Sequence, residues 1–104
     1  MTKTYSVVWD VKAKEALKEI FDYIKDDSPS AAKKVRITLL QLAASLRTYP
    51  NKFAAEPYLA HKGKNYRSVT KWSYKLIYRV GNDEVRILAI IHTKRNTSVF
   101  DELG

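Results

Sequence analysis

The chain has 104 residues, of which 45% are apolar and 29% charged, an ordinary composition for one folded domain over residues 1–104. It has no cysteine, which excludes disulfides and thiolate metal sites, and no apolar run long enough to span a bilayer. Its net charge is +8, and no apolar leader precedes the first charged region, so we expect a basic, cytoplasmic protein.

The N-terminal segment is predicted to form a short strand followed by an amphipathic helix. Residues Tyr5 to Trp9 are β-branched and aromatic, as in an opening strand. Asp10 is predicted to cap the helix, because its carboxylate can accept the free N–H groups of the first turn. The helix has apolar residues at spacings of three and four, which gives one buried stripe: Ala13, Leu17, Ile20, Phe21 and Ile24.

A break at Asp26 to Pro29 separates this helix from a second one. Ser28 is predicted as the N-cap, and Pro29 as the first helical residue, where its missing N–H has no cost. The second helix is expected to end before Pro50. It carries its own apolar stripe, which predicts a helical hairpin with a shared seam: Ala32, Val35, Leu39, Leu42 and Leu46.

Residues Asn51 to Lys64 show no sustained periodicity and are expected to form a loop. Three strands are predicted after it, over Tyr66 to Lys71, Trp72 to Val80 and Glu84 to His92, with a tight turn at Gly81-Asn82-Asp83. The last strand is apolar on both faces, which is typical of a central strand. Residues 96–104 are expected to add a short edge piece.

Alternation places the side chains of the second of these strands on two faces. Trp72, Tyr74, Leu76, Tyr78 and Val80 share one face, and Ser73, Lys75, Ile77 and Arg79 share the other. The predicted fold is therefore α+β. It has an N-terminal strand, a helical hairpin and an antiparallel β-meander, with the helices packed on one sheet face and the other face open.

Positive charge is concentrated in the C-terminal half. From Pro57 to Asn82 there is no acidic residue, and such a stretch attracts polyanions, either phosphate backbones or an acidic protein segment. Aromatic residues alternate with the cations and could stack on bases. The alternatives are a solubilising surface for the cations and core packing for the aromatics. The cations of this stretch are Lys62, Lys64, Arg67, Lys71, Lys75 and Arg79.

The element order and particular residues resemble the RelE/ParE toxin superfamily of type II toxin–antitoxin systems, which includes plasmid stabilization system proteins. The N-terminal half resembles the ParE-like branch at Trp9, Ala16-Leu17, Ile20, Tyr23-Ile24, Ser28-Pro29 and Ala31-Ala32. The C-terminal half resembles the whole superfamily at Tyr66-Arg67, Tyr74 to Val80 and Ile90-Ile91-His92-Thr93-Lys94-Arg95.

The resemblance implies a growth-inhibiting toxin that a cognate antitoxin neutralises. RelE-like toxins cleave messenger RNA on the ribosome, whereas ParE-like toxins poison DNA gyrase. The shared fold does not choose between these activities, so the choice depends on the site residues.

The residues implied by a RelE-like site are only partly present. Arg67 and Arg95 match basic positions of that branch, and Lys75 replaces an arginine. Val69 stands where a second lysine is expected, and Phe100 stands about where the catalytic tyrosine is, although phenylalanine cannot carry a proton.

Two further residues could replace the missing groups. Lys71 lies on the same strand face as Arg67, and His92 has a side chain that titrates near neutrality. His92 could equally be a hydrogen-bonded framework residue, and Arg67 could form a surface ion pair with Glu56 or Glu102. The catalytic candidates for a RelE-like activity are therefore Arg67, Lys71, Lys75, His92 and Arg95.

The sequence thus favours a toxin that binds its target without hydrolysing it. The candidates for target or antitoxin binding are Arg67, Lys75, Arg79, Lys94 and Arg95. One alternative is a ribosome-dependent, metal-independent mRNA endonuclease, and another is a non-toxic basic RNA- or protein-binding module. No cofactor or metal is expected, because the glycines are isolated and the histidines and carboxylates are scattered.

Overall fold

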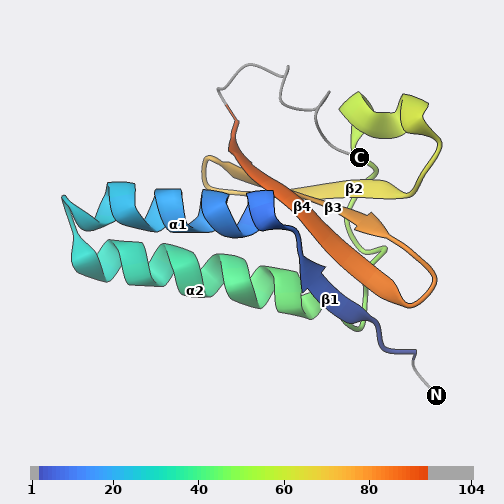
Figure 1. The fold of residues 1–104 in the computed structure, drawn as a ribbon, viewed down its shortest axis with the longest axis horizontal. Coiled ribbons are helices and arrows are strands. Elements are labelled where there is room, and N and C mark those ends of the chain that lie inside the picture. Colours follow the sequence, from blue (N-terminus) through green and yellow to red (C-terminus); the bar gives the residue numbers. More distant parts are fainter. Residues whose placement is uncertain (1–2, 94–104) are drawn as a thin grey trace.

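A computed structural model describes residues 3–93, which form a helical hairpin packed against one four-stranded sheet (Figure 1). The predicted α+β order is confirmed, and the predicted tail piece at residues 96–104 lies outside the described residues. The elements are β1 (Ser6–Trp9), α1 (Val11–Lys25), α2 (Pro29–Ser45), the 3-10 helix η1 (Pro57–Lys62), β2 (Tyr66–Lys71), β3 (Tyr74–Val80) and β4 (Glu84–His92).

The two helix starts use different caps. Ser28 caps α2 as predicted, because its Oγ accepts a hydrogen bond from the Ala31 N–H at 3.2 Å and Pro29 follows it. Asp10 occupies the cap position of α1, but its side chain makes no capping hydrogen bond. Its backbone N–H instead donates to the Ile87 carbonyl at 2.9 Å, which fixes the start of α1 against β4.

The strands lie in the order β1-β4-β3-β2. β4 is paired on both sides and buried over most of its length, as predicted for an apolar central strand. It pairs antiparallel with β3 and parallel with β1. The parallel pairing of β1 was not predicted, because the strand's own sequence does not specify its partner.

An unpredicted turn separates β2 from β3, so β3 begins at Tyr74 and not at Trp72 as predicted. Lys71 and Tyr74 are paired across the two strands, so Trp72 and Ser73 are the central residues of a two-residue turn and do not belong to β3. Trp72 has a φ of 54°, the left-handed conformation that such turns require and that glycine or asparagine usually provides.

The larger core lies between the sheet and the hairpin. The alternation predicted for β3 is confirmed there, because Leu76 and Tyr78 are fully buried under the helices and Tyr74 and Val80 pack beside them. Buried residues of both helices and the C-cap residue of α2, Leu46, complete this core; the helical residues are Ala13, Leu39 and Ala43.

The opposite face of the sheet is partly covered, which corrects the expectation that it is open. Leu59 of η1 is fully buried in a second core against Ile77, Leu88 and Ile91. The segment predicted as a loop therefore contains a helix that packs on the sheet. In the part of the chain that the structure describes, no helix is long and apolar enough to cross a bilayer.

Residues 54–56 run antiparallel to the start of β2. The Glu56 N–H donates to the Tyr66 carbonyl at 2.9 Å, and the Ser68 N–H donates to the Ala54 carbonyl at 3.2 Å. These bonds occupy part of the free edge of β2 and place residue 56 beside the sheet.

Candidate functional site

The pleat of the sheet divides the predicted site cations between its two faces. Arg67 stands directly opposite Tyr78, whose side chain points into the core under the helices. Side chains alternate between the two faces along β3. Lys75 and Arg79 therefore point away from the face of Tyr78 and toward the face that η1 partly covers. Arg67 and Lys75 consequently lie on opposite sides of the sheet and do not converge on one substrate group.

The guanidinium of Arg67 holds the segment that leads into the edge of β2. Its Nε donates to Asn65 Oδ1 at 3.0 Å, and its Nη1 donates to the carbonyls of Phe53 at 2.6 Å and Asn51 at 3.3 Å. A planar guanidinium offers several fixed donors and can satisfy these acceptors together. The side chain is half-buried, and its predicted binding role has to compete with these internal contacts.

Lys75 forms an ion pair with Glu56 on the other face. Its Nζ lies 2.9 Å from Glu56 Oε2, and the Glu56 side chain is 0% exposed. The second carboxylate oxygen, Oε1, accepts the Tyr58 N–H at 3.2 Å, and the Lys75 ammonium lies 5.7 Å from the centre of the Tyr58 ring. The ion pair that the sequence suggested for Arg67 and Glu56 is therefore made by Lys75.

Glu56 is held in its charged form. Burial by itself raises the pKa of a carboxylic acid, but the contacts with Ser68, Lys75 and the Tyr58 N–H outweigh burial and leave the pKa of Glu56 below its usual value of 4.5. A buried carboxylate that stays ionised at neutral pH requires its cation, so Lys75 has a structural role at this position.

Tyr78 connects the sheet to the end of the helical hairpin. Its hydroxyl donates to the Pro50 carbonyl at 2.8 Å, and its ring is fully buried. Burial raises the pKa of Tyr78 to about 12, although the nearby charge of Arg67 opposes the shift. The phenol is therefore neutral at physiological pH and donates a hydrogen bond without serving as an acid.

Lys71 and His92 lie at the opposite end of the same sheet face as Arg67. Tyr74 is paired with both of them, and its ring meets the imidazole edge-on with the centroids 5.9 Å apart. Beside them is a cavity of about 560 Å³ between α1 and the ends of β3 and β4. Its lining residues are Ala16, Glu19, Ile20, Tyr23, Tyr74, Ile90 and His92.

Lys94, Arg95, Phe100 and Glu102 lie outside the described residues, so the predictions made for them stay predictions. Within residues 3–93, no three histidine, cysteine or acidic side chains are grouped as they would be around a metal ion.

Two residues, Glu56 and Trp72, have surroundings that the sequence does not predict. Glu56 follows no motif, and its burial depends on the pairing of residues 54–56 with β2, which the local sequence does not reveal. Trp72 was assigned to a strand because tryptophan favours strands. The two segments of strand-forming residues on either side of Lys71-Trp72-Ser73 were the only signal for a turn at that position.

Comparison with known proteins identifies similar chains. Residues 7–97 match the family model described as the ParE toxin of the type II toxin–antitoxin system parDE. Among solved structures, the fold is similar to a chain of the chromosomal ParDE toxin–antitoxin system from P. aeruginosa. That pair has a TM-score of 0.72 and 24% identity, and the alignment covers 88% of this chain and 98% of that one.

The fold is also similar to a chain of the toxin–antitoxin complex RelBE2 from Mycobacterium tuberculosis. The TM-score is 0.63 and the identity 20%, with 88% of this chain and 94% of that one covered. At these identities the two structures show only that the fold is shared. The assignment of the chain to a family rests on the match of its sequence to the family model. No curated protein sequence matches the chain.

Proposed function

The chain belongs to the ParE toxin family of type II toxin–antitoxin systems, and we propose that it arrests growth in the cytoplasm by binding a target such as DNA gyrase without hydrolysing it. Metal-free RNA cleavage needs a base, an acid and cations around one phosphate. The observation that carries the proposal is the separation of Arg67 from Lys75, which lie on opposite sheet faces. Each of these cations is also bound within the chain, Arg67 to the Phe53 carbonyl and Lys75 to the Glu56 carboxylate.

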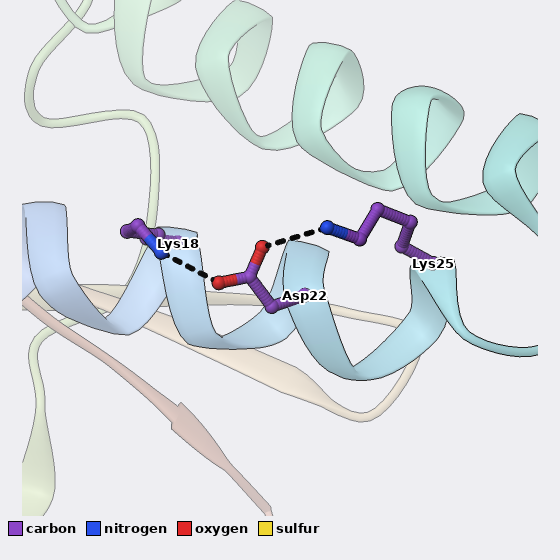
Figure 2. Close-up of polar contacts among 3 residues, drawn as sticks. All are labelled: Lys18, Asp22 and Lys25. Atoms are coloured by element: carbon purple, nitrogen blue, oxygen red, sulfur yellow. Dashed lines mark hydrogen bonds and ion pairs between the residues drawn. The ribbon is translucent and has the colours of Figure 1, made fainter.

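We further propose that a cognate antitoxin neutralises the chain by covering the outer face of α2. The exposed charges of α1 are partly paired with one another: Asp22 lies 2.7 Å from Lys18 Nζ and 3.6 Å from Lys25 Nζ (Figure 2). The hydrogen bond from Lys18 lowers the pKa of Asp22 and keeps it ionised. These contacts offset part of the charge with which α1 could attract a partner.

The charges of α2, in contrast, are all positive. It carries Lys33, Lys34 and Arg36 and no acidic residue. Its outer surface also exposes apolar side chains, with Ile37 50% and Leu40 41% exposed. A segment that folds on binding must bury apolar residues and offset positive charge, so an amphipathic acidic helix fits this surface.

The gyrase proposal can be tested with purified components. Purified chain is incubated with gyrase and supercoiled plasmid, and the reaction is stopped with detergent and protease to reveal DNA held in a cleaved complex. We expect linear plasmid to accumulate with the chain present and to disappear when the antitoxin is added first. Absence of linear DNA at chain concentrations that arrest growth would exclude gyrase as the target.

A parallel reaction addresses the endonuclease alternative. Programmed ribosomes carrying a labelled messenger RNA are incubated with the same preparation of the chain. The proposal predicts intact RNA, whereas cleavage in the decoding site would support the RelE-like activity.

A further inference from the structure

A continuous row of aromatic and cationic side chains crosses the end of the sheet next to α1. Tyr74 is its centre: it is paired with His92 on β4 and with Lys71 on β2. The Lys71 ammonium lies 5.2 Å from the centre of the Trp72 ring. We call Lys71, Trp72, Tyr74 and His92 the hairpin-end row.

Trp72 is held in a conformation that its side chain disfavours. It occupies the first central position of the two-residue turn with a φ of 54°, where a bulky residue is a steric outlier. The residue remains 49% exposed, so core packing does not explain the choice of tryptophan. Strain of this kind is retained where the side chain serves a function, and an exposed indole provides a flat stacking surface.

The charges around the row favour a polyanion. No acidic residue occurs between Pro57 and Asn82, and the row itself contains no carboxylate. The N–H of Thr93 donates to the Ser73 carbonyl at 2.8 Å, so β4 ends at the turn that carries Trp72.

We propose that the hairpin-end row is a binding site for single-stranded nucleic acid. An unpaired base stacks on the Trp72 indole, and a neighbouring phosphate meets the Lys71 ammonium beside it. Duplex DNA does not fit the site, because its bases are already stacked and an exposed ring at a turn cannot reach their faces. This inference does not depend on gyrase being the target.

Replacing Glu19 tests whether the ligand of the hairpin-end row is negatively or positively charged. Glu19 lies on the α1 wall of the cavity that Tyr74 and His92 also line, and it is the acidic residue among the lining side chains. A phosphate chain is repelled by this carboxylate, whereas a basic peptide is attracted to it. Glu19→Gln should therefore strengthen the binding of nucleic acid.

The experiment measures fluorescence anisotropy of labelled single strands of about ten nucleotides, a length within the range covered by single-strand-binding folds. Oligo-dT, oligo-dA and oligo-rU are titrated with the purified chain between about 50 and 200 mM salt. The deoxy and ribo strands distinguish DNA from RNA as the natural ligand, and the matching duplex is included for comparison.

Trp72→Gly is the main variant, because glycine adopts a positive φ without strain and the turn should fold at least as well. We expect it to weaken single-strand binding by about 5- to 150-fold, the loss typical of one stacked base. Trp72→Phe should retain most of the affinity. An unchanged melting temperature in each variant shows that the effect is not unfolding.

Lys71→Ala should reduce the slope of log affinity against log salt by about 0.7, the value for one phosphate contact on a single strand. Lys52→Ala is the matched control, because the Lys52 ammonium lies 4.9 Å from the Phe53 ring in an equivalent sequential pair outside the row. Tyr49→Ala, which removes another exposed aromatic ring, controls for Trp72. Neither control should change binding.

Three results would overturn the proposal: no binding of any single strand at low salt, equal binding by wild type and Trp72→Gly, or weaker binding by Glu19→Gln. If Trp72→Gly instead abolishes binding to purified gyrase or antitoxin while wild type binds no oligonucleotide, the row is a protein-docking surface and the nucleic-acid proposal is wrong.

Discussion

Lys75 Nζ lies 2.9 Å from the Oε2 atom of a fully buried carboxylate, Glu56. This ion pair joins β3 to the segment that enters η1, on the sheet face opposite the helical hairpin. A cation that the sequence marked as a target-binding candidate is therefore engaged inside the molecule. Removing one partner leaves a buried charge without its counterion. The resulting loss of stability therefore measures how much the ion pair contributes to the fold.

Lys75→Met is expected to destabilise the chain by about 2–4 kcal/mol, near the lower part of the range for broken buried pairs because Lys75 remains 21% exposed. Urea unfolding measures the change, with exposed Lys52→Met as the control. Adding Glu56→Leu to Lys75→Met should recover most of the loss, since no charge is then left unpaired. A double variant that is stable but no longer arrests growth would instead assign Lys75 to the target site.

The lowered pKa of Glu56 predicts a loss of stability in acid. Because the folded-state pKa lies below the usual 4.5, the carboxylate contributes stability that is fully present above about pH 4.5 and is lost as pH falls through the folded pKa. Unfolding free energies of wild type and Glu56→Gln, measured from pH 7 downward, should converge below that pH. Parallel curves over the whole range would show that Glu56 is not preferentially ionised in the fold.

The raised pKa of Tyr78 predicts a loss of stability at alkaline pH. This pKa of about 12 lies above the usual 10.0, so the contribution of Tyr78 is complete below pH 10.0 and is lost as pH rises through about 12. Tyr78→Phe should remove this alkaline step and cost about 1–2 kcal/mol at neutral pH, because the Pro50 carbonyl loses its donor. Tyr49→Phe, at an exposed ring, should change neither quantity.

Arg67→Glu should weaken both growth arrest and antitoxin affinity, because Arg67 is a candidate for binding the target or the antitoxin. Part of that effect is structural, because the substitution also removes the donors to the Phe53 and Asn51 carbonyls and should cost about 1–3 kcal/mol. Arg67→Lys separates the two contributions, since it keeps the charge but not the planar fork. Full arrest and full affinity in the folded Arg67→Glu variant would remove Arg67 from the functional surface.

Ile37→Glu is expected to reduce antitoxin affinity by at least tenfold, because it places an acidic group on the α2 surface proposed to receive an acidic, apolar segment. The side chain is half-exposed, so the melting temperature should stay within a few degrees of wild type. Titration calorimetry with purified antitoxin measures the affinity, and Tyr49→Glu is the control. Unchanged affinity would place the antitoxin on another surface.

Local sequence patterns determined most of the elements correctly. The stripes of α1 and α2, the Ser28-Pro29 start and the alternation along β3 all reflect burial of one side of an element, which a period of apolar residues reports directly. The prediction that the Asp10 carboxylate caps α1 is wrong, because this side chain makes no capping hydrogen bond. The hydrogen bond from the Asp10 backbone N–H to the Ile87 carbonyl fixes the start of the helix instead.

The site was less predictable, because its geometry depends on pairings between distant segments. Alternation places Lys75 on one face and Arg67 on the other only when the β2–β3 register is known. The partner of Lys75 comes from a segment whose pairing with β2 has no periodic signal. The turn at Trp72 was missed because its residue type contradicts its backbone conformation.

Induced expression in a bacterial host without the antitoxin tests the central claim most directly. Messenger RNA 5′ ends are mapped in the same cultures in which DNA breaks are measured, with the double variant Glu56→Leu, Lys75→Met expressed in parallel. Growth arrest by target binding predicts DNA breaks in both cultures and no new codon-positioned RNA ends. New RNA ends at defined codon positions, or normal growth without DNA breaks, would contradict it.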